Sequence, residues 1–393
     1  MKKKIRLLFV VEEVMTNGAM ISMLSLLDAL PEEKYDISLF VFEHSGNLMG
    51  RIPSKVNILP EKIAYSVHRL PAIPAIRKAL RHKRIDLVLY RLLLSFQRRM
   101  QWSYHFWIWL PLIEGDYDVV CTYADGFVAP AILRKVKTGR KCCWVHFPYT
   151  KAPLMPYEYD ALKKADACAI VSKTVGDDLD IVLGKCDVAK FVVHNIVDAE
   201  VCIRKAAEPC PFIKKEGVYR LVSVGRITPA KGFDIVSVVA EELIRRKILF
   251  EWYVIGDGED LEKFRLEVKS KKLDFCVHFV GNMPNPLSMV KSADVVVQPS
   301  KFESWGMTIS EALCLGKAIV ASNLAVFEEQ IQNGYNGILR PTVPSIMAEA
   351  IESLLVNGSS RHRLEANAIN YPFTKEHILE EFNAMITYVL DKR

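Results

Sequence analysis

Short apolar runs rich in β-branched and aromatic residues alternate with stretches of helical periodicity along the whole chain. Buried strands separated by helical stretches are typical of parallel sheets with crossover helices. The pattern therefore predicts an α/β protein with two Rossmann-like, doubly wound parallel sheets. The predicted strands are 5–11, 36–42, 118–124, 142–147, 167–172 and 190–195 in the first half, and 219–225, 250–256, 277–281, 294–300 and 318–322 in the second.

The alternation lapses in an aperiodic segment with two prolines between positions 198 and 217. Such a segment is typical of an interdomain linker, and single cores stop growing at roughly 250 to 300 residues. We predict an N-terminal domain over 1–200, a C-terminal domain over 201–375, and a last helix over 376–393 that packs back on the first domain. Ligands of doubly wound sheets bind at the carboxyl ends of the strands, so the two domains are expected to face each other across a cleft.

The nine cysteines favour a reducing cytosol, because their number is odd and none forms a C-x-x-C pair. The N-terminal MKKKIRLLFVV resembles the start of a signal peptide, but Glu12 and Glu13 interrupt its apolar stretch, and we interpret it as a buried strand. The best apolar run, 106–113, has eight residues, whereas a membrane span needs roughly 18. We expect a cytoplasmic protein that is not integral to a membrane.

Positive charge is concentrated in one segment. The net charge is +6, yet 77–99 contains eight Arg and Lys residues and one acid, a balance of +7, so the rest of the chain carries +6 − 7 = −1. Trp102, Trp107 and Trp109 follow. Cations beside tryptophans suit an anionic lipid surface, where each cation contributes about 1 kcal/mol, and a solvated helix followed by core aromatics explains the pattern equally well. No nucleic-acid-binding motif accompanies the charges, so a peripheral contact of 77–109 with the inner face of an anionic membrane is the alternative to the solvated helix.

Two cations lie in the loop after the strand 219–225. Arg226 and Lys231 are five residues apart and lead into a helix. A helix N-terminus attracts phosphate, an arginine can fork onto two oxygens, and a lysine acts as a point charge. The loop could therefore hold a diphosphate without a metal, although Arg and Lys in a loop are usually just solvated. Asp178 and Asp180 have the spacing of a D-x-D metal site but belong to a helical pattern, so neither a metal nor a cofactor is expected.

Two carboxylates follow the strand 294–300. Glu303 lies in the strand-end loop, Gly306 permits close backbone approach, and Glu311 lies about one turn inside the predicted helix 307–315. A carboxylate can accept hydrogen bonds from neighbouring sugar hydroxyls. Alternatively, Glu303 caps the helix and Glu311 is an exposed acid. Because Glu311 belongs to the apolar stretch EALCLG, its burial without a ligand would be unfavourable.

This segment resembles the retaining GT-B glycosyltransferases of family 4, a group 1 type, whose C-terminal domain carries E-x-F-G-x4-E-A-x3-G-x-P. Trp305 replaces the usual Phe and Ala318 the usual Pro. The resemblance covers essentially all of 217–357, through VSVGRITPAKGFD, YVIGDGED, VHFVGN, ADVVVQPSKFESWG and NGYNGILRP. The positions that match the motif are Glu303, Gly306, Glu311, Ala312 and Gly316.

The resemblance implies a role for each matching position. Arg226 and Lys231 would hold the diphosphate, Glu311 the ribose and Glu303 the sugar ring. The backbone of Gly306, Met307 and Thr308 would assist at the phosphates, beside Gly225, and the backbone of Asn282 and Met283 would contact the base.

The N-terminal half matches the family more loosely. Asn17-Gly18 stands where the family has a Gly-Gly pair, and Gly18 would approach the diphosphate and sugar of the donor. Asn tolerates a left-handed backbone. His146 resembles the family's strand-end histidine, which contacts the donor sugar, although a lone histidine after a strand is more often a packing or surface residue.

The resemblance implies a metal-independent hexosyltransferase that retains the anomeric configuration. Its donor would be a nucleotide sugar, a UDP-sugar more often than a GDP-sugar, and its acceptor a hydroxyl of a glycan or lipid-linked glycan in cell-surface polysaccharide synthesis. Catalysis would come from positioning and stabilisation of the leaving phosphate, without a protein nucleophile. Two alternatives remain: a nucleotide-sugar isomerase of the UDP-sugar 2-epimerase type on the same fold, and a non-catalytic nucleotide-sugar-binding protein.

Overall fold

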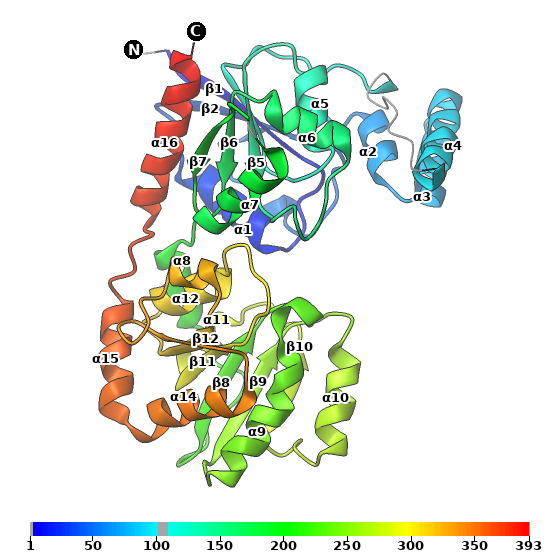
Figure 1. Ribbon diagram of the computed structural model, residues 1–393. Coiled ribbons are helices and arrows are strands. Elements are labelled where there is room, and N and C mark those ends of the chain that lie inside the picture. The colour runs from blue at the N-terminus through cyan, green and yellow to red at the C-terminus, as the bar shows by residue number, and fades with distance from the viewer. Residues whose placement is uncertain (1–2, 101–108, 185, 393) are drawn as a thin grey trace. The chain divides into compact units, whose positions relative to one another are not determined.

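The computed structural model describes residues 3–100, 109–184 and 186–392. The chain divides into two compact units (Figure 1). Unit 1 contains Met1–Ile196 and Glu376–Arg393, and unit 2 contains Val197–Lys375. Each unit is built on one parallel sheet, so the predicted α/β architecture with two doubly wound sheets is confirmed.

The sheet of unit 1 has seven strands in the order β3-β2-β1-β4-β5-β6-β7. All strands are parallel, but successive strands are added on one side of β1 up to β3 and on the other side from β4 onward. The position between β1 and β4 is therefore the switch point at which doubly wound sheets bind their ligands. The strands are β1 (Ile5–Val11), β2 (Tyr35–Val41), β3 (Asn57–Ile58), β4 (Val119–Thr122), β5 (Arg140–Val145), β6 (Ala167–Ile170) and β7 (Ala189–Val192).

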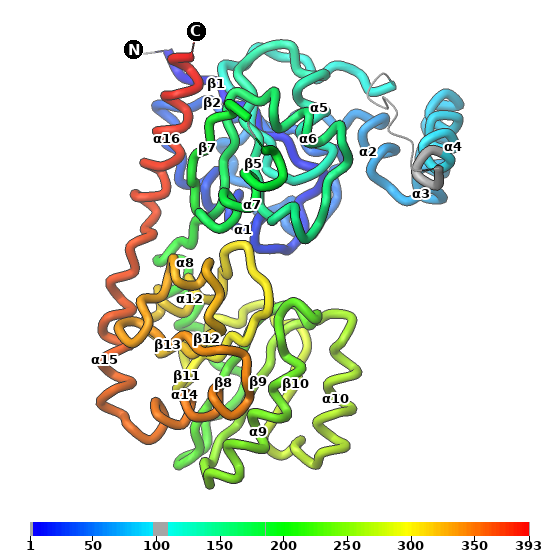
Figure 2. Tube along the Cα trace, viewed as in Figure 1, coloured from blue at the N-terminus to red at the C-terminus, as the bar shows by residue number. Residues whose placement is uncertain are grey.

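Helices connect the strands of unit 1 and cover the sheet (Figure 2). The last helix, α16, packs on this unit. Its Phe382 stacks on Phe9 and Trp144, with ring centroids 6.4 and 6.1 Å apart, and its Glu381 accepts a hydrogen bond from the backbone of His194 at 3.0 Å. The helices are α1 (Gly18–Ala29), the 3-10 turn η1 (Met49–Arg51), α2 (Ile63–Arg69), α3 (Ala72–Arg81), α4 (Ile85–Met100), α5 (Val128–Lys135), α6 (Pro156–Lys163), α7 (Lys173–Leu183) and α16 (Lys375–Asp391).

The sheet of unit 2 has six strands in the order β10-β9-β8-β11-β12-β13, with its own switch point between β8 and β11. All its pairings are parallel, so the carboxyl ends of the strands share one edge. The strands are β8 (Tyr219–Val224), β9 (Phe250–Ile255), β10 (Val277–Gly281), β11 (Val295–Gln298), β12 (Ile319–Ser322) and β13 (Ile338–Arg340).

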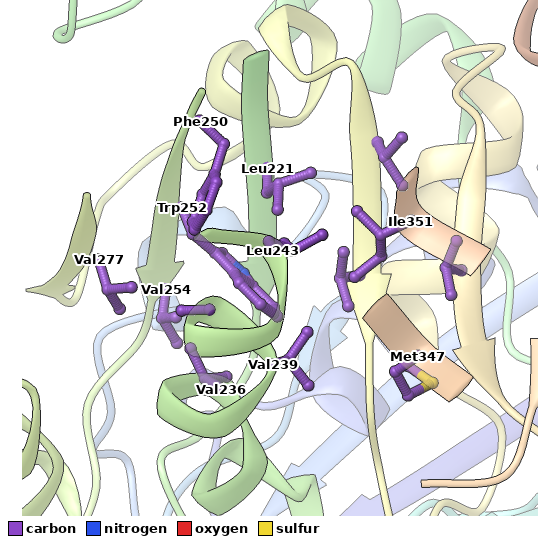
Figure 3. Close-up of a cluster of buried hydrophobic side chains, with 14 of the residues drawn as sticks. Leu221, Val236, Val239, Leu243, Phe250, Trp252, Val254, Val277, Met347 and Ile351 are labelled. Carbon is purple, nitrogen blue, oxygen red and sulfur yellow. The ribbon is translucent and has the colours of Figure 1, made fainter. Parts of the chain in front are cut away.

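Two apolar clusters hold the helices of unit 2 on its sheet. Figure 3 shows one of them, where Leu243 and Ile351 from two helices pack near the fully buried Trp252 of β9. Each fully buried Leu or Ile side chain contributes about 1.5 to 3 kcal/mol, so packing holds these helices in place. The helices are α8 (Ala199–Ala206), the 3-10 turns η3 (Pro229–Lys231) and η4 (Phe233–Ile235), α9 (Val236–Arg245), α10 (Leu261–Ser270), α11 (Leu287–Ser292), α12 (Met307–Cys314), α13 (Ala325–Glu328), α14 (Pro344–Val356) and α15 (Gly358–Ala368).

The predicted strands are confirmed to within a few residues at each end, but the predicted linker is wrong in part. Helix α8 lies inside it and belongs to unit 2. Asp198 caps this helix by accepting a hydrogen bond from the N–H of Val201 at 2.9 Å, and Cys202 is buried against the unit. The short edge strands β3 and β13 were not predicted, because two or three residues carry no readable period.

Candidate functional site

The loop after β8 is fixed by backbone hydrogen bonds to the neighbouring strand end. Gly225 donates to the carbonyl of Ile255 and Ile227 donates to that of Asp257, each at 2.9 Å. Between these two anchors, the side chain of Arg226 is exposed and makes no hydrogen bond or ion pair with another described residue. Its guanidinium is therefore available to an anion at the carboxyl edge of the sheet.

The second cation of this loop, Lys231, is paired with the first of the two carboxylates. Its Nζ lies 2.5 Å from Oε1 of Glu303, and the Glu303 side chain is only 9% exposed. The two residues are 72 positions apart, and the parallel order of β8 and β11 brings them together. The alternative in which Glu303 caps the helix is therefore wrong, since α12 has no side-chain cap.

A buried chain of polar groups orients Glu303 from behind. The amide of Gln298 donates to Oγ of Ser300 at 2.9 Å, and Ser300 donates to Oε1 of Glu303 at 3.0 Å. The direction of these bonds is certain, because an amide NH2 can only donate and an ionised carboxylate can only accept. Oε1 thus accepts hydrogen bonds from both Lys231 and Ser300. Oε2 has no hydrogen-bond partner among the described residues and can accept a hydrogen bond from a ligand.

Gly232 allows the Lys231 turn to lie against the end of β11. Its φ is +67°, and a Cβ at this position would come within 1.9 Å of the carbonyl oxygen of Pro299. Lys301 and Phe302 donate backbone hydrogen bonds to Ala230 at 2.8 and 3.1 Å. Backbone hydrogen bonds therefore hold the loops after β8 and β11 together.

The start of α12 is a second anion-attracting feature. Gly306 begins the helix with φ +91°, and a Cβ there would lie 2.6 Å from the ring of Phe327. Thr308 is anchored through its hydroxyl, which donates to the carbonyl of Val224 at 3.1 Å. The backbone N–H groups of Met307 and Thr308 have no hydrogen-bond partner in the described part of the chain, so they are available to a phosphate oxygen.

Glu311 lies half-buried in the second turn of α12. Its side chain makes no hydrogen bond or ion pair within the described ranges. Removal from water raises its pKa to about 7, and Lys205 offsets this shift in part. The carboxylate is neither buried in a salt bridge nor a freely exposed acid. A ligand could therefore supply the hydrogen bonds that this carboxylate lacks.

The two residues expected at the base are less defined. Asn282 and Met283 directly follow β10; Asn282 is exposed, while Met283 is half-buried and packs on an apolar cluster of unit 2. They belong to the same carboxyl edge as Arg226, Lys231 and Glu303.

In unit 1, Gly18 opens α1 after the end of β1. Asn17 does not use the left-handed backbone that asparagine tolerates. Asn17 has an extended backbone with φ −153°, and its side chain caps α1 by accepting from the N–H of Met20 at 2.9 Å. An N-cap needs an extended residue with a short polar side chain, and Asn meets both conditions.

His146 follows β5 and contacts Tyr123, with ring centroids 4.8 Å apart. Neither ring nitrogen makes a hydrogen bond of normal geometry to a described residue. Burial lowers the pKa of His146 to about 3, and the nearby backbone of Tyr123 opposes this shift only weakly. The imidazole is therefore neutral at pH 7 and can exchange hydrogen bonds with an uncharged partner.

Asp125 is a neighbour of His146 that the sequence analysis missed. It accepts from the backbone N–H of His146 at 3.1 Å and from the Tyr149 hydroxyl at 2.7 Å. Burial raises the pKa of Asp125 to about 6, against the effect of these two hydrogen bonds. The sequence offered one signal: Asp125 directly follows the predicted strand 118–124, and His146 lies at the end of the predicted strand 142–147. These two strands are neighbours in the sheet, so their ends lie close together.

Unit 2 thus brings Arg226, Lys231, Glu303, Gly306 and Glu311 to one sheet edge, and unit 1 brings His146 and Asp125 together. Residues 208–371 match the family model for glycosyl transferases group 1. The match lies within unit 2. The matched region carries the two carboxylates and two cations on the loops after β8 and β11 and on α12.

Known proteins resemble the chain over its whole length and over unit 2 alone. An uncharacterized glycosyltransferase of Methanocaldococcus jannaschii is 25% identical over 378 residues, which cover 88% of this chain and 93% of that protein. The alpha-D-kanosaminyltransferase of Streptomyces kanamyceticus is 32% identical over 158 residues, or 39% of this chain and 40% of that protein. The chain therefore spans less than half of this second relative.

The fold of both units is also that of solved glycosyltransferase-type structures. Anabaena HepE in complex with UDP and glucose is 15% identical, with a TM-score of 0.69 over 98% of this chain and 99% of that protein. The two parallel-sheet domains are thus those of the GT-B fold, as predicted. In the described part of the chain, the helices are too short or too polar to cross a bilayer.

Proposed function

We propose that the chain is a retaining, family 4 glycosyltransferase that moves a sugar from a nucleotide sugar to a hydroxyl group. One observation carries the proposal. At a single sheet edge of unit 2, an exposed guanidinium, an open Oε2 of Glu303 and an unpaired Glu311 all lack a partner among the described residues. A diphosphate with a sugar at one end and a ribose at the other supplies a partner for each.

In this proposal Arg226 and Lys231 bind the diphosphate, with the N–H groups of Met307 and Thr308. Glu311 accepts from the ribose hydroxyls, and Oε2 of Glu303 accepts from the sugar ring. The loop at Asn282 and Met283 lies beside the base. His146 and Gly18 of unit 1 act on the sugar and on the diphosphate.

The chemical step needs no protein nucleophile in this proposal. The bond between the anomeric carbon and the leaving phosphate breaks, and the acceptor oxygen forms its bond on the same face of the sugar. A phosphate oxygen takes the acceptor proton, while Arg226, Lys231 and the helix N–H groups stabilise the charge of the leaving diphosphate. These groups supply the charge that a metal would otherwise supply, so we propose a metal-independent hexosyltransferase without a cofactor.

We favour UDP as the nucleotide. Support comes from HepE, which shares the fold and was solved with UDP and glucose. The proposed acceptor is a glycan or lipid-linked glycan in cell-surface polysaccharide synthesis, at the cytoplasmic face of the membrane.

The test is a panel of UDP- and GDP-sugars, measured for binding by calorimetry and then for transfer or hydrolysis. We expect one nucleotide class to bind and both Lys231→Ala and Glu311→Ala to weaken that binding strongly. Matched controls are Lys269→Ala and Glu349→Ala, which remove an exposed lysine and an exposed glutamate of unit 2. Unchanged binding in the two site variants would overturn the donor assignment.

The products separate this proposal from its two alternatives. A retaining transferase gives a glycoside with the donor's anomeric configuration, which NMR identifies. Release of an epimerised sugar without any acceptor would establish an isomerase instead. Binding without turnover across acceptors would indicate a binding protein.

A further inference from the structure

Helix α4 of unit 1 presents a row of large apolar side chains to solvent. These side chains are between 42% and 76% exposed, and their spacing of three, four and seven residues places them on one face of the helix. The opposite face is buried in unit 1. The exposed residues are Ile85, Leu89, Leu92, Leu93 and Phe96, and the buried ones are Leu87, Tyr90, Arg91 and Leu94.

Helix α3 lies against α4 and has a similar outer face (Figure 1). Ile73 and Leu80 are 64% and 56% exposed, whereas Ala75 and Ala79 are fully buried. Soluble proteins rarely leave so many large apolar side chains together on two adjoining helices unless the surface has a partner. This α3–α4 hairpin is therefore a candidate interaction surface.

Cations accompany the apolar face. Arg77, Arg81 and Lys83 are exposed, and none of their side chains makes a hydrogen bond or ion pair with a described residue. Arg77 lies one turn from Ile73, and Arg81 one turn from Arg77, so both share a face with the apolar residues of α3. Of the sequence segment 77–109, the part around Trp102 and Trp107 lies outside the described residues, while Trp109 stacks on Tyr90 with ring centroids 5.8 Å apart.

The base of the hairpin is tied to the strand ends of unit 1 by ion pairs. Arg69, at the end of α2, bonds to Glu13 after β1 and to Glu43 after β2. Lys78 of α3 lies 2.6 Å from Glu61, which accepts from the backbone of His44 at 2.8 Å. These pairs fix the hairpin to the carboxyl edge of the sheet.

We propose that the α3–α4 hairpin docks the protein on an anionic lipid bilayer. The apolar faces enter the boundary between headgroups and acyl chains, and Arg77, Arg81 and Lys83 bind the lipid phosphates. A lipid fits better than a protein partner because unpaired cations flank the apolar residues, while the single acid of the hairpin, Asp86, is already paired with Arg84. The inference rests on the proposed function for its purpose, since it would hold the acceptor side of the enzyme at a lipid-linked substrate.

The experiment is sedimentation of the full chain with vesicles of phosphatidylcholine, with and without phosphatidylglycerol. We expect binding only to the anionic vesicles. The variant Leu89→Ser/Leu92→Ser/Phe96→Ser should bind at least tenfold more weakly. Its matched control is Leu249→Ser/Leu266→Ser/Phe275→Ser, which removes two exposed leucines and one exposed phenylalanine from unit 2 and should bind like the unmodified chain.

A second variant, Arg77→Gln/Arg81→Gln/Lys83→Gln, leaves the apolar residues intact and changes only exposed positions. It should lose about fivefold in vesicle binding for each cation at low salt, with a smaller effect at high salt. Equal binding by the unmodified chain and both hairpin variants would overturn the proposal. So would failure to bind anionic vesicles together with dimerisation that the serine variant abolishes, because the hairpin would then be covered by a second copy.

The donor assay keeps this test separate from the proposed function. Both hairpin variants should bind the nucleotide sugar like the unmodified chain. Loss of vesicle binding with intact donor binding supports the docking surface, whereas intact vesicle binding by a chain that binds no nucleotide sugar would overturn the function and leave the surface standing.

Discussion

The strand ends of the two units carry different kinds of chemistry. In unit 2, cations and carboxylates share one edge, and Lys231 is already paired with Glu303 at 2.5 Å. In unit 1, His146 is neutral because burial lowers its pKa to about 3, and the neighbouring Asp125 is held by a tyrosine and a backbone N–H. Under the proposed function, this difference assigns the charged diphosphate to unit 2 and a hydrogen bond to the uncharged sugar to His146 of unit 1.

The largest effect is expected for Lys231→Ala, which tests whether unit 2 binds the diphosphate. It removes a charge-assisted bond to phosphate, worth roughly 1.5 to 3 kcal/mol, and leaves the buried Glu303 without its counter-ion. We expect the affinity for the nucleotide sugar to fall about 100-fold, measured by calorimetry. Lys269→Ala should leave it unchanged, and a loss of less than about threefold would place the diphosphate elsewhere.

Glu311→Gln tests the second carboxylate through its pH dependence. Accepting from two ribose hydroxyls requires the ionised form, and the pKa of Glu311 is raised to about 7 in the free protein. Affinity for a UDP-sugar should therefore rise with pH through about 7, and the variant should lose this rise and bind about 30-fold more weakly at pH 8. An unchanged pH profile would remove Glu311 from the ribose site.

The same shift has a consequence for stability. The folded pKa of Glu311 lies above its ordinary value, so the folded state holds a proton that the unfolded state has released. The stabilisation this gives is present at acidic pH and is lost as the pH rises to about 7. Urea unfolding should show this loss in the unmodified chain and a weaker one in Glu311→Gln.

His146→Ala tests the contribution of unit 1 separately from that of unit 2. A neutral hydrogen bond to the sugar is worth roughly 0.5 to 1.5 kcal/mol, so we expect transfer to slow about tenfold. The affinity for free UDP, which lacks the sugar, should stay within about twofold. A parallel loss of UDP binding would contradict the assignment of His146 to the sugar.

The smallest expected effect is that of Ser300→Ala. The hydroxyl only orients Glu303, so kcat should fall about three- to fivefold with little change in KM. Ser300→Thr, which keeps the hydroxyl, should recover part of the rate. Equal losses in both variants would indicate a packing defect rather than a lost orientation.

The sequence predicted much of the fold because long apolar runs report burial directly. The eleven predicted strands all exist, and among the described residues the only strands that were not predicted are the edge strands β3 and β13. Helix α8 was missed because its boundaries depend on the Asp198 cap and on packing with unit 2, neither of which has a period.

The sequence analysis named the residues of the candidate site, but it did not predict the hydrogen bonds and ion pairs among them. Lys231 and Glu303 were assigned to different parts of the donor, and nothing in a spacing of 72 residues indicates that they pair. Asp125 was missed for a similar reason, because the parallel strand order brings it to His146. Ser300 was missed because its bond to Glu303, three residues later in the same loop, has no sequence signal. The N-cap role of Asn17 was not predicted either, although the helix that follows needs a cap.

The pairing of Lys231 with Glu303 also bears on which anions the edge admits. An anion that approaches Lys231 competes with a carboxylate already in place. Inorganic phosphate could displace that carboxylate only by leaving it nearly buried and without its counter-ion, which is strongly unfavourable. A nucleotide sugar brings hydroxyl groups that can satisfy Glu303 while its phosphates take Lys231. Under the proposed function, we therefore expect Lys231 to favour ligands that carry both a phosphate and a sugar over simple anions.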